Sequence, residues 1–172
     1  MRKLMTAAVL VVAMGLAAQA EAQTAAAKPF QFGPQVDFAT QSIGLGVGAR
    51  AVYNDLGTTL KVPGLKALAS FDYFFPGSSF GPSAKYWEIN VDATYDLKIN
   101  GLNGVAPYVG AGLGYDNWSW NYGLGSISYN STSLNILGGG RFKLGPTLHA
   151  FAEARFELRS SGALVLTGGL LF

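Results

Sequence analysis

Apolar and polar residues alternate along much of this chain with a period of two, which is the pattern of a β-strand that has one apolar face. In the clearest segment, 86–99, every odd-numbered residue from Trp87 to Ile99 is apolar, and the residues from Glu88 to Lys98 between them are polar. The same pattern and the turn-forming clusters between segments predict eight strands. They cover residues 43–53, 58–62, 67–75, 86–99, 105–120, 134–144, 148–159 and 163–172.

The first two of these segments depend on how the turns are placed. Val36 and Phe38 alternate as a strand does, but they are out of phase with Ile43, so a bulge at 39–42 is needed if they extend the first strand backwards. Residues 54–57 predict a turn. The segment 58–62 is a short predicted strand that ends at the turn signal Pro63-Gly64.

Eight antiparallel strands fit either a soluble sandwich or barrel, or a barrel that spans a membrane. Charged residues make up 13% of the chain, against about 25% in an average soluble protein. In a transmembrane barrel the apolar face meets lipid, the polar face fills the interior, and closure pairs every backbone group. The sequence therefore predicts an all-β fold, an eight-stranded antiparallel up-and-down transmembrane β-barrel.

The N-terminus has the pattern of a secretory signal peptide. Arg2 and Lys3 precede an apolar stretch, and small residues follow, with Ala22 the favoured cleavage position. An uncleaved helical anchor is the alternative. We expect a signal peptide at 1–22, a short periplasmic segment at 23–33 and an outer-membrane barrel at 34–172. An even number of strands places both chain termini in the periplasm, with turns 54–57, 76–85, 121–132 and 160–162 outside the cell.

Composition argues against several classes of function. The net charge is +2 without a run of basic residues, so nucleic-acid binding is not expected. There is no cysteine and only one histidine, His149, which leaves few ligands for a metal site. His149 follows a predicted periplasmic turn and has no nearby serine in the sequence. We therefore expect no cofactor, no metal and no catalysis.

Four segments resemble those of a known family. They are Ser70-Phe71-Asp72-Tyr73-Phe74-Phe75-Pro76, the strand 107–114, the glycines 138–140 and the ending Leu166-Thr167-Gly168-Gly169-Leu170-Leu171-Phe172. The mature chain is similar to the small eight-stranded outer-membrane β-barrel proteins, a group that includes OmpX-like, opacity-type and OmpA transmembrane-domain-like barrels. The resemblance implies that Phe172 is an insertion signal for the outer-membrane assembly machinery. The chain also resembles the lipid A deacylase and palmitoyltransferase barrels, which are enzymes. These enzymes need a histidine near the outer leaflet, whereas His149 is predicted at the periplasmic end.

The alternation places a set of charged residues on the inner face of the predicted barrel. Buried charges are costly without partners, so we expect carboxylates and cations to pair across the lumen and to plug it. The inner face is also rich in glycine, which leaves room for a narrow conductance, and a selectivity filter is the alternative role for the same charges. The predicted lumen network consists of Asp37, Arg50, Lys61, Asp72, Glu88, Asp92, Asp96, Lys98, Asp116, Arg141, Lys143, Glu153, Arg155, Glu157 and Arg159.

These expectations combine into a monomeric outer-membrane barrel of a Gram-negative bacterium with a structural or surface-interaction role. The alternative is a narrow, porin-like pore for small solutes or ions. The expected partners are outer-membrane lipids, including lipopolysaccharide, and the assembly machinery during biogenesis. The extracellular loops, of which 121–132 is the longest predicted, are the expected surface for any interaction with other molecules.

Overall fold

The computed structural model describes residues 29–76, 84–99, 101–102, 104–121 and 125–172. The predicted signal peptide lies outside these residues. The described elements are β1 (Phe30–Ala39), β2 (Gly44–Tyr53), α2 (Leu56–Leu60), β3 (Leu65–Phe75), β4 (Lys85–Asp96), β5 (Val105–Asn121), β6 (Ser126–Lys143), β7 (His149–Leu158) and β8 (Ala163–Leu171).

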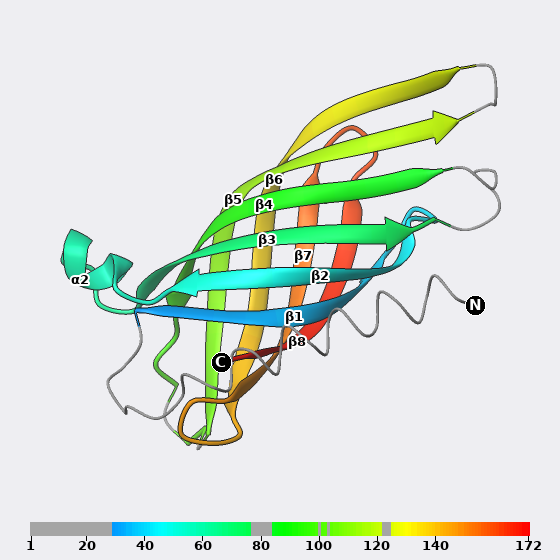
Figure 1. The fold of residues 1–172 in the computed structure, drawn as a ribbon. Coiled ribbons are helices and arrows are strands. Elements are labelled where there is room, and N and C mark those ends of the chain that lie inside the picture. The colour runs from blue at the N-terminus through cyan, green and yellow to red at the C-terminus, as the bar shows by residue number, and fades with distance from the viewer. Residues whose placement is uncertain (1–28, 77–83, 100, 103, 122–124) are drawn as a thin grey trace.

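Each strand pairs antiparallel with the next one along the chain, and β8 pairs antiparallel with β1, so the sheet closes into a barrel (Figure 1). The predicted fold class is therefore confirmed, with eight strands in up-and-down order. No helix in the described part of the chain is long and apolar enough to cross a membrane.

The number of strands was predicted correctly, but two of the segments were assigned wrongly. Residues 58–62 form no strand: α2 lies here, and Thr59 N–H donates to Asp55 O at 3.1 Å as in a helical turn. The eighth strand is instead β1, which begins at Phe30, inside the segment 23–33 that was expected to precede the barrel. No bulge extends β2 backwards. A tight turn with positive φ at Gln41 and Ser42 separates β1 from β2 and changes the phase of the alternation.

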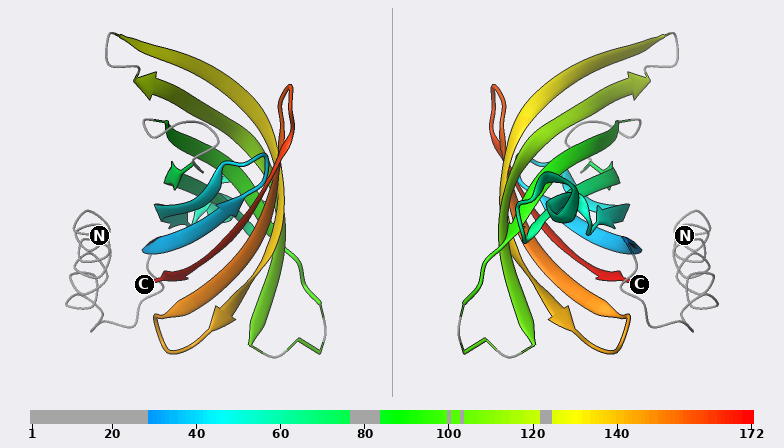
Figure 2. Two further views of the ribbon diagram at one scale, coloured as in Figure 1. Left: turned by 90° about the vertical axis from the view of Figure 1, so that its right-hand side faces the viewer. Right: turned by 90° about the vertical axis from the view of Figure 1, so that its left-hand side faces the viewer.

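The two ends of the barrel differ. One end carries the start of β1, the end of β8, α2 and the turns 97–104 and 144–148, and we call it the terminal end. The other carries the turns after β1, β3, β5 and β7, and we call it the hairpin end. The turn 54–57 therefore lies at the terminal end, opposite to its prediction. Most of the predicted loop 121–132 belongs to β6, and the β5–β6 hairpin projects beyond its neighbours (Figure 2).

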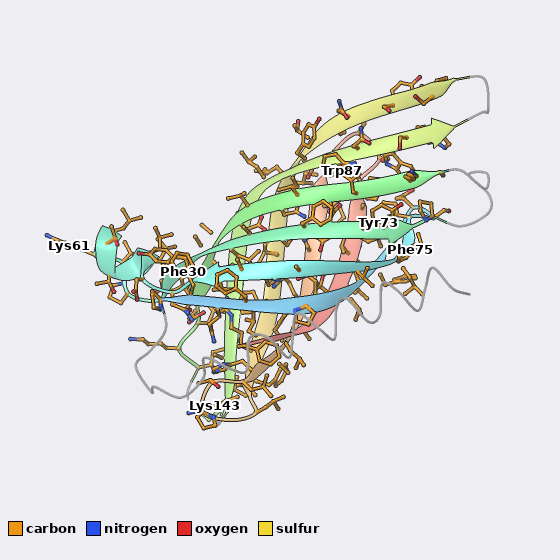
Figure 3. The ribbon with its side chains drawn as sticks, in the orientation of Figure 1. Phe30, Lys61, Tyr73, Phe75, Trp87 and Lys143 are labelled. Carbon is orange, nitrogen blue, oxygen red and sulfur yellow. The ribbon has the colours of Figure 1, made fainter. Side chains whose placement is uncertain are left out.

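The outer face of the barrel is apolar and the inner face is largely polar, as the alternation predicts. Val91 is 60% exposed and Ile136 is 52% exposed, while their neighbours along the strands, Asp92 and Asn135, are buried. Aromatic side chains lie near both ends of the outer face: Figure 3 shows Tyr73, Phe75 and Trp87 toward the hairpin end and Phe30 at the terminal end. Such aromatic bands are typical of transmembrane barrels, where they lie at the two membrane interfaces.

The seam between β1 and β8 closes the barrel. Its register runs from Gln35 opposite Gly169 to Ala39 opposite Val165, which makes it the shortest ladder of the sheet. Beyond the ladder, Phe172 N–H donates to Phe32 O at 2.9 Å. Pro34, which has no N–H, occupies the intervening part of β1.

Candidate functional site

The centre of the barrel interior is organised around Arg155, a β7 residue that is completely buried. Its guanidinium forms an ion pair with Glu88 from β4 and donates from Nε to Glu157 Oε1 at 3.2 Å. Its Nη2 also lies 3.7 Å from Asp72 Oδ2 of β3. One cation thus compensates carboxylates from three strands, and its position depends on closure of the whole sheet.

Asp72 is held further by neutral side chains. Gln35 Nε2 donates to Asp72 Oδ1 at 2.5 Å, and Ser70 Oγ donates to Oδ2 at 3.0 Å. Asn90 Nδ2 lies 3.4 Å from the same Oδ2. The carboxylate therefore has several hydrogen-bond donors in addition to Arg155, which is what a buried charge requires.

A second buried ion pair lies nearer the terminal end. Arg50 donates from Nη1 and Nη2 to the two oxygens of Glu153, at 2.9 and 2.6 Å. Tyr108 OH donates to the same carboxylate at 2.7 Å, and the guanidinium of Arg50 lies 4.2 Å from the ring centre of Phe151. This is the two-pronged geometry in which arginine binds carboxylate most strongly.

A third group of charges lies at the rim of the terminal end. Arg141 donates to Asp96 Oδ1 at 2.5 Å, and Lys66 Nζ lies 2.9 Å from Asp96 Oδ2. Arg141 also packs against the ring of Tyr108 at 4.1 Å. The side chains of Lys66 and Asp96 are partly exposed, so this group borders solvent.

At the hairpin end, Arg159 joins two carboxylates. Its Nη1 lies 3.2 Å from Asp116 Oδ2 and its Nη2 lies 3.2 Å from Glu157 Oε2. Nη1 also donates to Tyr86 OH at 2.8 Å, and that hydroxyl donates to Glu88 Oε2 at 3.0 Å. A chain of polar contacts therefore links the centre of the barrel to this end.

Apolar clusters lie at both ends of the polar interior. The cluster at the terminal end contains Val52, Leu68, Phe151 and Leu171. The cluster at the hairpin end contains Ala39, Ile43, Phe74, Tyr86, Ala163 and Val165, with Trp118 packed against it. The inward side chains of β7 therefore pass from the apolar Phe151 through Glu153 and Arg155 to Glu157, and Arg159 follows just after the strand.

Glycines on the inner face do not leave the space that their lack of a side chain suggests. A Cβ built on Gly48 would contact the Asp72 carboxylate, and one built on Gly112 would contact Asp92. A Cβ built on Gly139 would contact the Tyr108 hydroxyl. Larger side chains from neighbouring strands fill these positions, so glycine content alone does not indicate an open path.

The predicted lumen residues fall into two groups, those that lie in the interior and those that are exposed. Of the interior residues, Asp96 and Arg159 are partly buried near the two ends of the barrel. The others are buried, namely Asp37, Arg50, Asp72, Glu88, Asp92, Asp116, Arg141, Glu153, Arg155 and Glu157. The interior placement is wrong for Lys61, Lys98 and Lys143, which are exposed. Lys61 follows α2, Lys98 follows the end of β4, and Lys143 is the last residue of β6. Figure 3 shows Lys61 beside α2 and Lys143 at the rim of the terminal end.

Neutral interior residues were missed in the sequence, although they share the inward parity of the charges. Their amides and hydroxyls connect the ion pairs, and their inward parity is the signal that could have identified them. Asn135, for example, donates to Asn90 Oδ1 at 2.8 Å and to Asp92 Oδ1 at 3.1 Å. The missed members that form side-chain hydrogen bonds are Gln35, Ser70, Tyr86, Asn90, Thr94, Tyr108, Ser133, Asn135 and Thr167.

His149 lies at the start of β7, at the terminal end. Its Nδ1 is 3.2 Å from Gln31 Nε2 and 3.3 Å from Thr147 O. Within the described residues, no group of three or more histidine or carboxylate side chains is placed to hold a metal ion.

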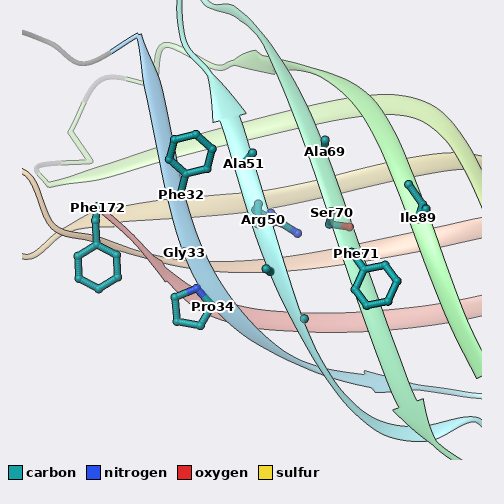
Figure 4. A pocket seen from close by; sticks show the side chains of 12 residues that line it. Phe32, Gly33, Pro34, Arg50, Ala51, Ala69, Ser70, Phe71, Ile89 and Phe172 are labelled. Carbon is teal, nitrogen blue, oxygen red and sulfur yellow. The ribbon is translucent and has the colours of Figure 1, made fainter. Parts of the chain in front are cut away.

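The outer face carries a shallow apolar pocket of about 450 Å³ next to the barrel seam. Phe32, Phe71 and Phe172 lie around it, and Ala51 and Ala69 provide the small residues between them (Figure 4). Phe172, the predicted insertion signal, thus lies on the surface that would contact lipid. Its role in assembly stays a prediction.

Comparisons with known proteins support the fold. No family model and no curated protein matches the sequence. Among solved structures, the chain is similar to the N-terminal β-barrel domain of OprF from Pseudomonas aeruginosa, with 16% identity, a TM-score of 0.62, and coverage of 84% of this chain and 97% of that one.

Two further structures give the same picture. Neisserial surface protein A has 19% identity and a TM-score of 0.64, over 83% of this chain and 94% of that one. A major outer membrane protein from Thermus thermophilus has 14% identity and a TM-score of 0.57, over 84% of this chain and 99% of that one. This chain has the fold of the small eight-stranded outer-membrane β-barrel proteins.

Proposed function

We propose that this protein is a monomeric outer-membrane β-barrel with a structural or surface-interaction role and a lumen plugged by its own side chains. The observation that carries the proposal is the layered interior, in which an ion-paired polar core lies between two apolar clusters. An eight-stranded barrel has an interior that side chains can just fill. The proposed role includes no catalysis.

The proposed location rests on the outer face and on the fold. The exposed apolar wall between two aromatic bands fits a bilayer, and its partners would be outer-membrane lipids, including lipopolysaccharide. Export would depend on the signal peptide at 1–22, and insertion on recognition of Phe172 by the assembly machinery. N-terminal sequencing of the membrane-extracted protein tests the first step, with Gln23 as the expected first residue.

A narrow pore is the second candidate function, and buried atoms without a partner are the observation in its favour. Among the described residues, Asp37 Oδ2, Asp92 Oδ2 and Arg155 Nη1 are buried without a hydrogen-bond partner. Such atoms are sites where water enters an interior. A connected line of water would let small ions pass.

Single-channel recording of the refolded mature chain in a planar bilayer separates the two candidates. We expect no conductance steps from the parent chain, with heat-modifiable gel mobility as the check that the barrel has folded. Arg155→Ala should also be silent, because both apolar clusters remain. Reproducible steps from the parent that change in size with Arg155→Ala would replace the plugged barrel with the narrow pore.

The proposed orientation places the hairpin end outside the cell, because export delivers the chain to the periplasm and an even number of strands leaves both of its termini on that side. The chain has no cysteine, so single-cysteine variants give a direct test. We expect a membrane-impermeant maleimide to label Gly125→Cys on intact cells and to label Lys61→Cys only after lysis. The reverse labelling would overturn the orientation.

A further inference from the structure

A pocket of about 340 Å³ lies at the hairpin end of the barrel, and we call it the mouth pocket. Its volume falls within the range of about 300–1,000 Å³ that is usual for small-molecule sites. The walls come from the β1–β2 turn, β5, β6 and the segment that follows β7. The lining residues are Gln41, Ile43, Asp116, Trp118, Trp120, Tyr129, Ser131, Arg159, Ser160 and Ser161.

One wall of the mouth pocket is aromatic. The rings of Trp118 and Trp120 are stacked, with centres 5.4 Å apart and an interplanar angle of 11°. Tyr86 packs against Trp118 at 4.6 Å, and Tyr129 meets Trp120 edge-on at 6.0 Å. The two tryptophans are partly exposed and fixed by these neighbours, so they present a preformed surface at little cost in side-chain entropy.

The floor of the mouth pocket is polar and incompletely satisfied. Asp116 is only 3% exposed, and its Oδ2 pairs with Arg159 Nη1 at 3.2 Å. Within the described part of the chain, Asp116 Oδ1 and Arg159 Nε have no hydrogen-bond partner. A buried acceptor and a buried donor therefore belong to side chains of the same lining, and a ligand that bonds to both, once these side chains rotate toward it, would satisfy them.

These features favour a neutral polyol over a charged ligand. A cation would suit the indole rings and the Asp116 carboxylate, but it offers no acceptor to Arg159 Nε. An anion would be repelled by the Asp116 carboxylate, and the charge of Arg159 is already compensated in part by Glu157. A sugar hydroxyl both donates and accepts, the C–H face of a sugar ring packs against aromatic rings, and serine hydroxyls line the same pocket.

We propose that the mouth pocket is a binding site for a neutral saccharide. The ring would lie against the tryptophan pair, and its hydroxyls would bond to Asp116 and Arg159. This inference rests on the proposed function in one respect, because it requires the hairpin end to face the exterior. It adds the chemical class of a partner to the surface-interaction role.

Tryptophan fluorescence of the refolded mature chain in lipid nanodiscs tests the proposal. The Trp87→Phe variant serves as the parent, because Trp87 lies on the outer face and its removal leaves only Trp118 and Trp120 as reporters. The probes are methyl glucoside, methyl galactoside, methyl mannoside, N-acetylglucosamine, maltose, lactose and cellobiose. We expect a saturable change with at least one of them, with a Kd on the order of 1 mM or tighter.

Two variants connect the signal to the pocket. Asp116→Asn keeps the volume but changes the acceptor, and Trp120→Ala removes half of the stacked pair; each should weaken the Kd at least about tenfold. Isothermal calorimetry gives a readout for Trp120→Ala that does not depend on its lost indole. Val91→Ala on the outer face is the matched control and should bind as the parent does. Heat-modifiable gel mobility checks that every variant is folded.

Three results would overturn the proposal. The first is the absence of any saturable response at about 100 mM of every sugar, roughly a hundred times the expected Kd. The second is binding that is unchanged in Asp116→Asn and Trp120→Ala. The third is a response to choline, or to the anionic sugar sialyllactose, without any response to the neutral sugars, which would assign a charged ligand instead.

The nanodisc measurement is independent of orientation and conductance, so the two proposals fail separately. Sugar binding with labelling of Gly125→Cys only after lysis would refute the outward orientation and leave the site intact. A silent, correctly oriented barrel without sugar binding would leave the proposed function and remove only the saccharide site.

Discussion

The centre of the barrel and the mouth pocket use the same chemistry in different surroundings. At the centre, Arg155 is completely buried and compensates carboxylates from three strands. At the mouth, Arg159 pairs with Asp116 beside partly exposed aromatic rings and an opening of about 340 Å³. We therefore assign arginine–carboxylate pairing a stabilising role at the buried centre and a recognition role at the mouth pocket. The difference between the two roles follows from the burial of Arg155 and from the open space beside Arg159.

The largest difference is expected when the central arginine is removed. Arg155→Met leaves Glu88, Glu157 and Asp72 without their shared cation, and breaking a buried pair in this way costs about 3–5 kcal/mol. Urea unfolding in lipid vesicles measures the loss. Arg155→Met with Glu88→Gln should recover part of it, and a variant as stable as the parent would show that the central network contributes little.

A smaller loss is expected on the lipid-facing wall. Ile136→Arg places a charge on the outer face near the middle of β6, where such changes cost about 2–4 kcal/mol in transmembrane barrels. Ser128→Arg lies on the same strand in the projecting hairpin and should change stability by less than about 0.5 kcal/mol. Equal losses from the two arginines, again by urea unfolding, would contradict the assignment of membrane-facing and projecting segments.

Packing around the inner glycines gives a third contrast. The added Cβ of Gly112→Ala would contact Val91 O and the Asp92 side chain, so we expect a loss of about 1–3 kcal/mol from overpacking. Gly125→Ala in the β5–β6 turn meets nothing within 4 Å and should be nearly neutral. Thermal unfolding of both variants measures the difference, and a neutral Gly112→Ala would indicate spare room inside the barrel.

The smallest effect on stability is expected at the mouth. Asp116→Asn retains an oxygen that accepts from Arg159, and Arg159 keeps Glu157 as a charged partner, so the unfolding free energy should fall by only about 1 kcal/mol. Urea unfolding under the conditions used for Arg155→Met measures it. A loss as large as that of Arg155→Met would place Asp116 in the stabilising core and remove the contrast between the two regions.

The sequence predicted the face of each long strand because closure imposes a strict two-residue period on all of them. It failed where the period was too short or interrupted. Residues 58–62 are too few to distinguish a strand from a helical turn. In β1, Gly33 and Pro34 interrupt the alternation, so the pattern did not show that the strand begins at Phe30. The wrong interior placement of the lysines has a related cause. The alternation of faces predicts an inward side chain only within the barrel wall, and Lys98 and Lys143 lie at or beyond its rim.

The partners of the interior charges could not be predicted, because they depend on how the strands are staggered around the barrel. Arg50 and Glu153 are 103 residues apart in sequence, and no local pattern connects them. The mouth pocket depends equally on the length of β5 and β6, which carries Trp120 and Tyr129 past the neighbouring strands. The sequence prediction of a loop at 121–132 concealed this extension.

The short seam between β1 and β8 has a consequence for the order of folding. It is joined from the inside by Thr167 Oγ1, which donates to Asp37 Oδ1 at 2.7 Å across 130 residues of sequence. Contacts of such separation form slowly, and until they form, β1 and β8 are unpaired edges that invite aggregation. Closure of this seam therefore removes both exposed strand edges in one step, after the last strand of the chain has formed.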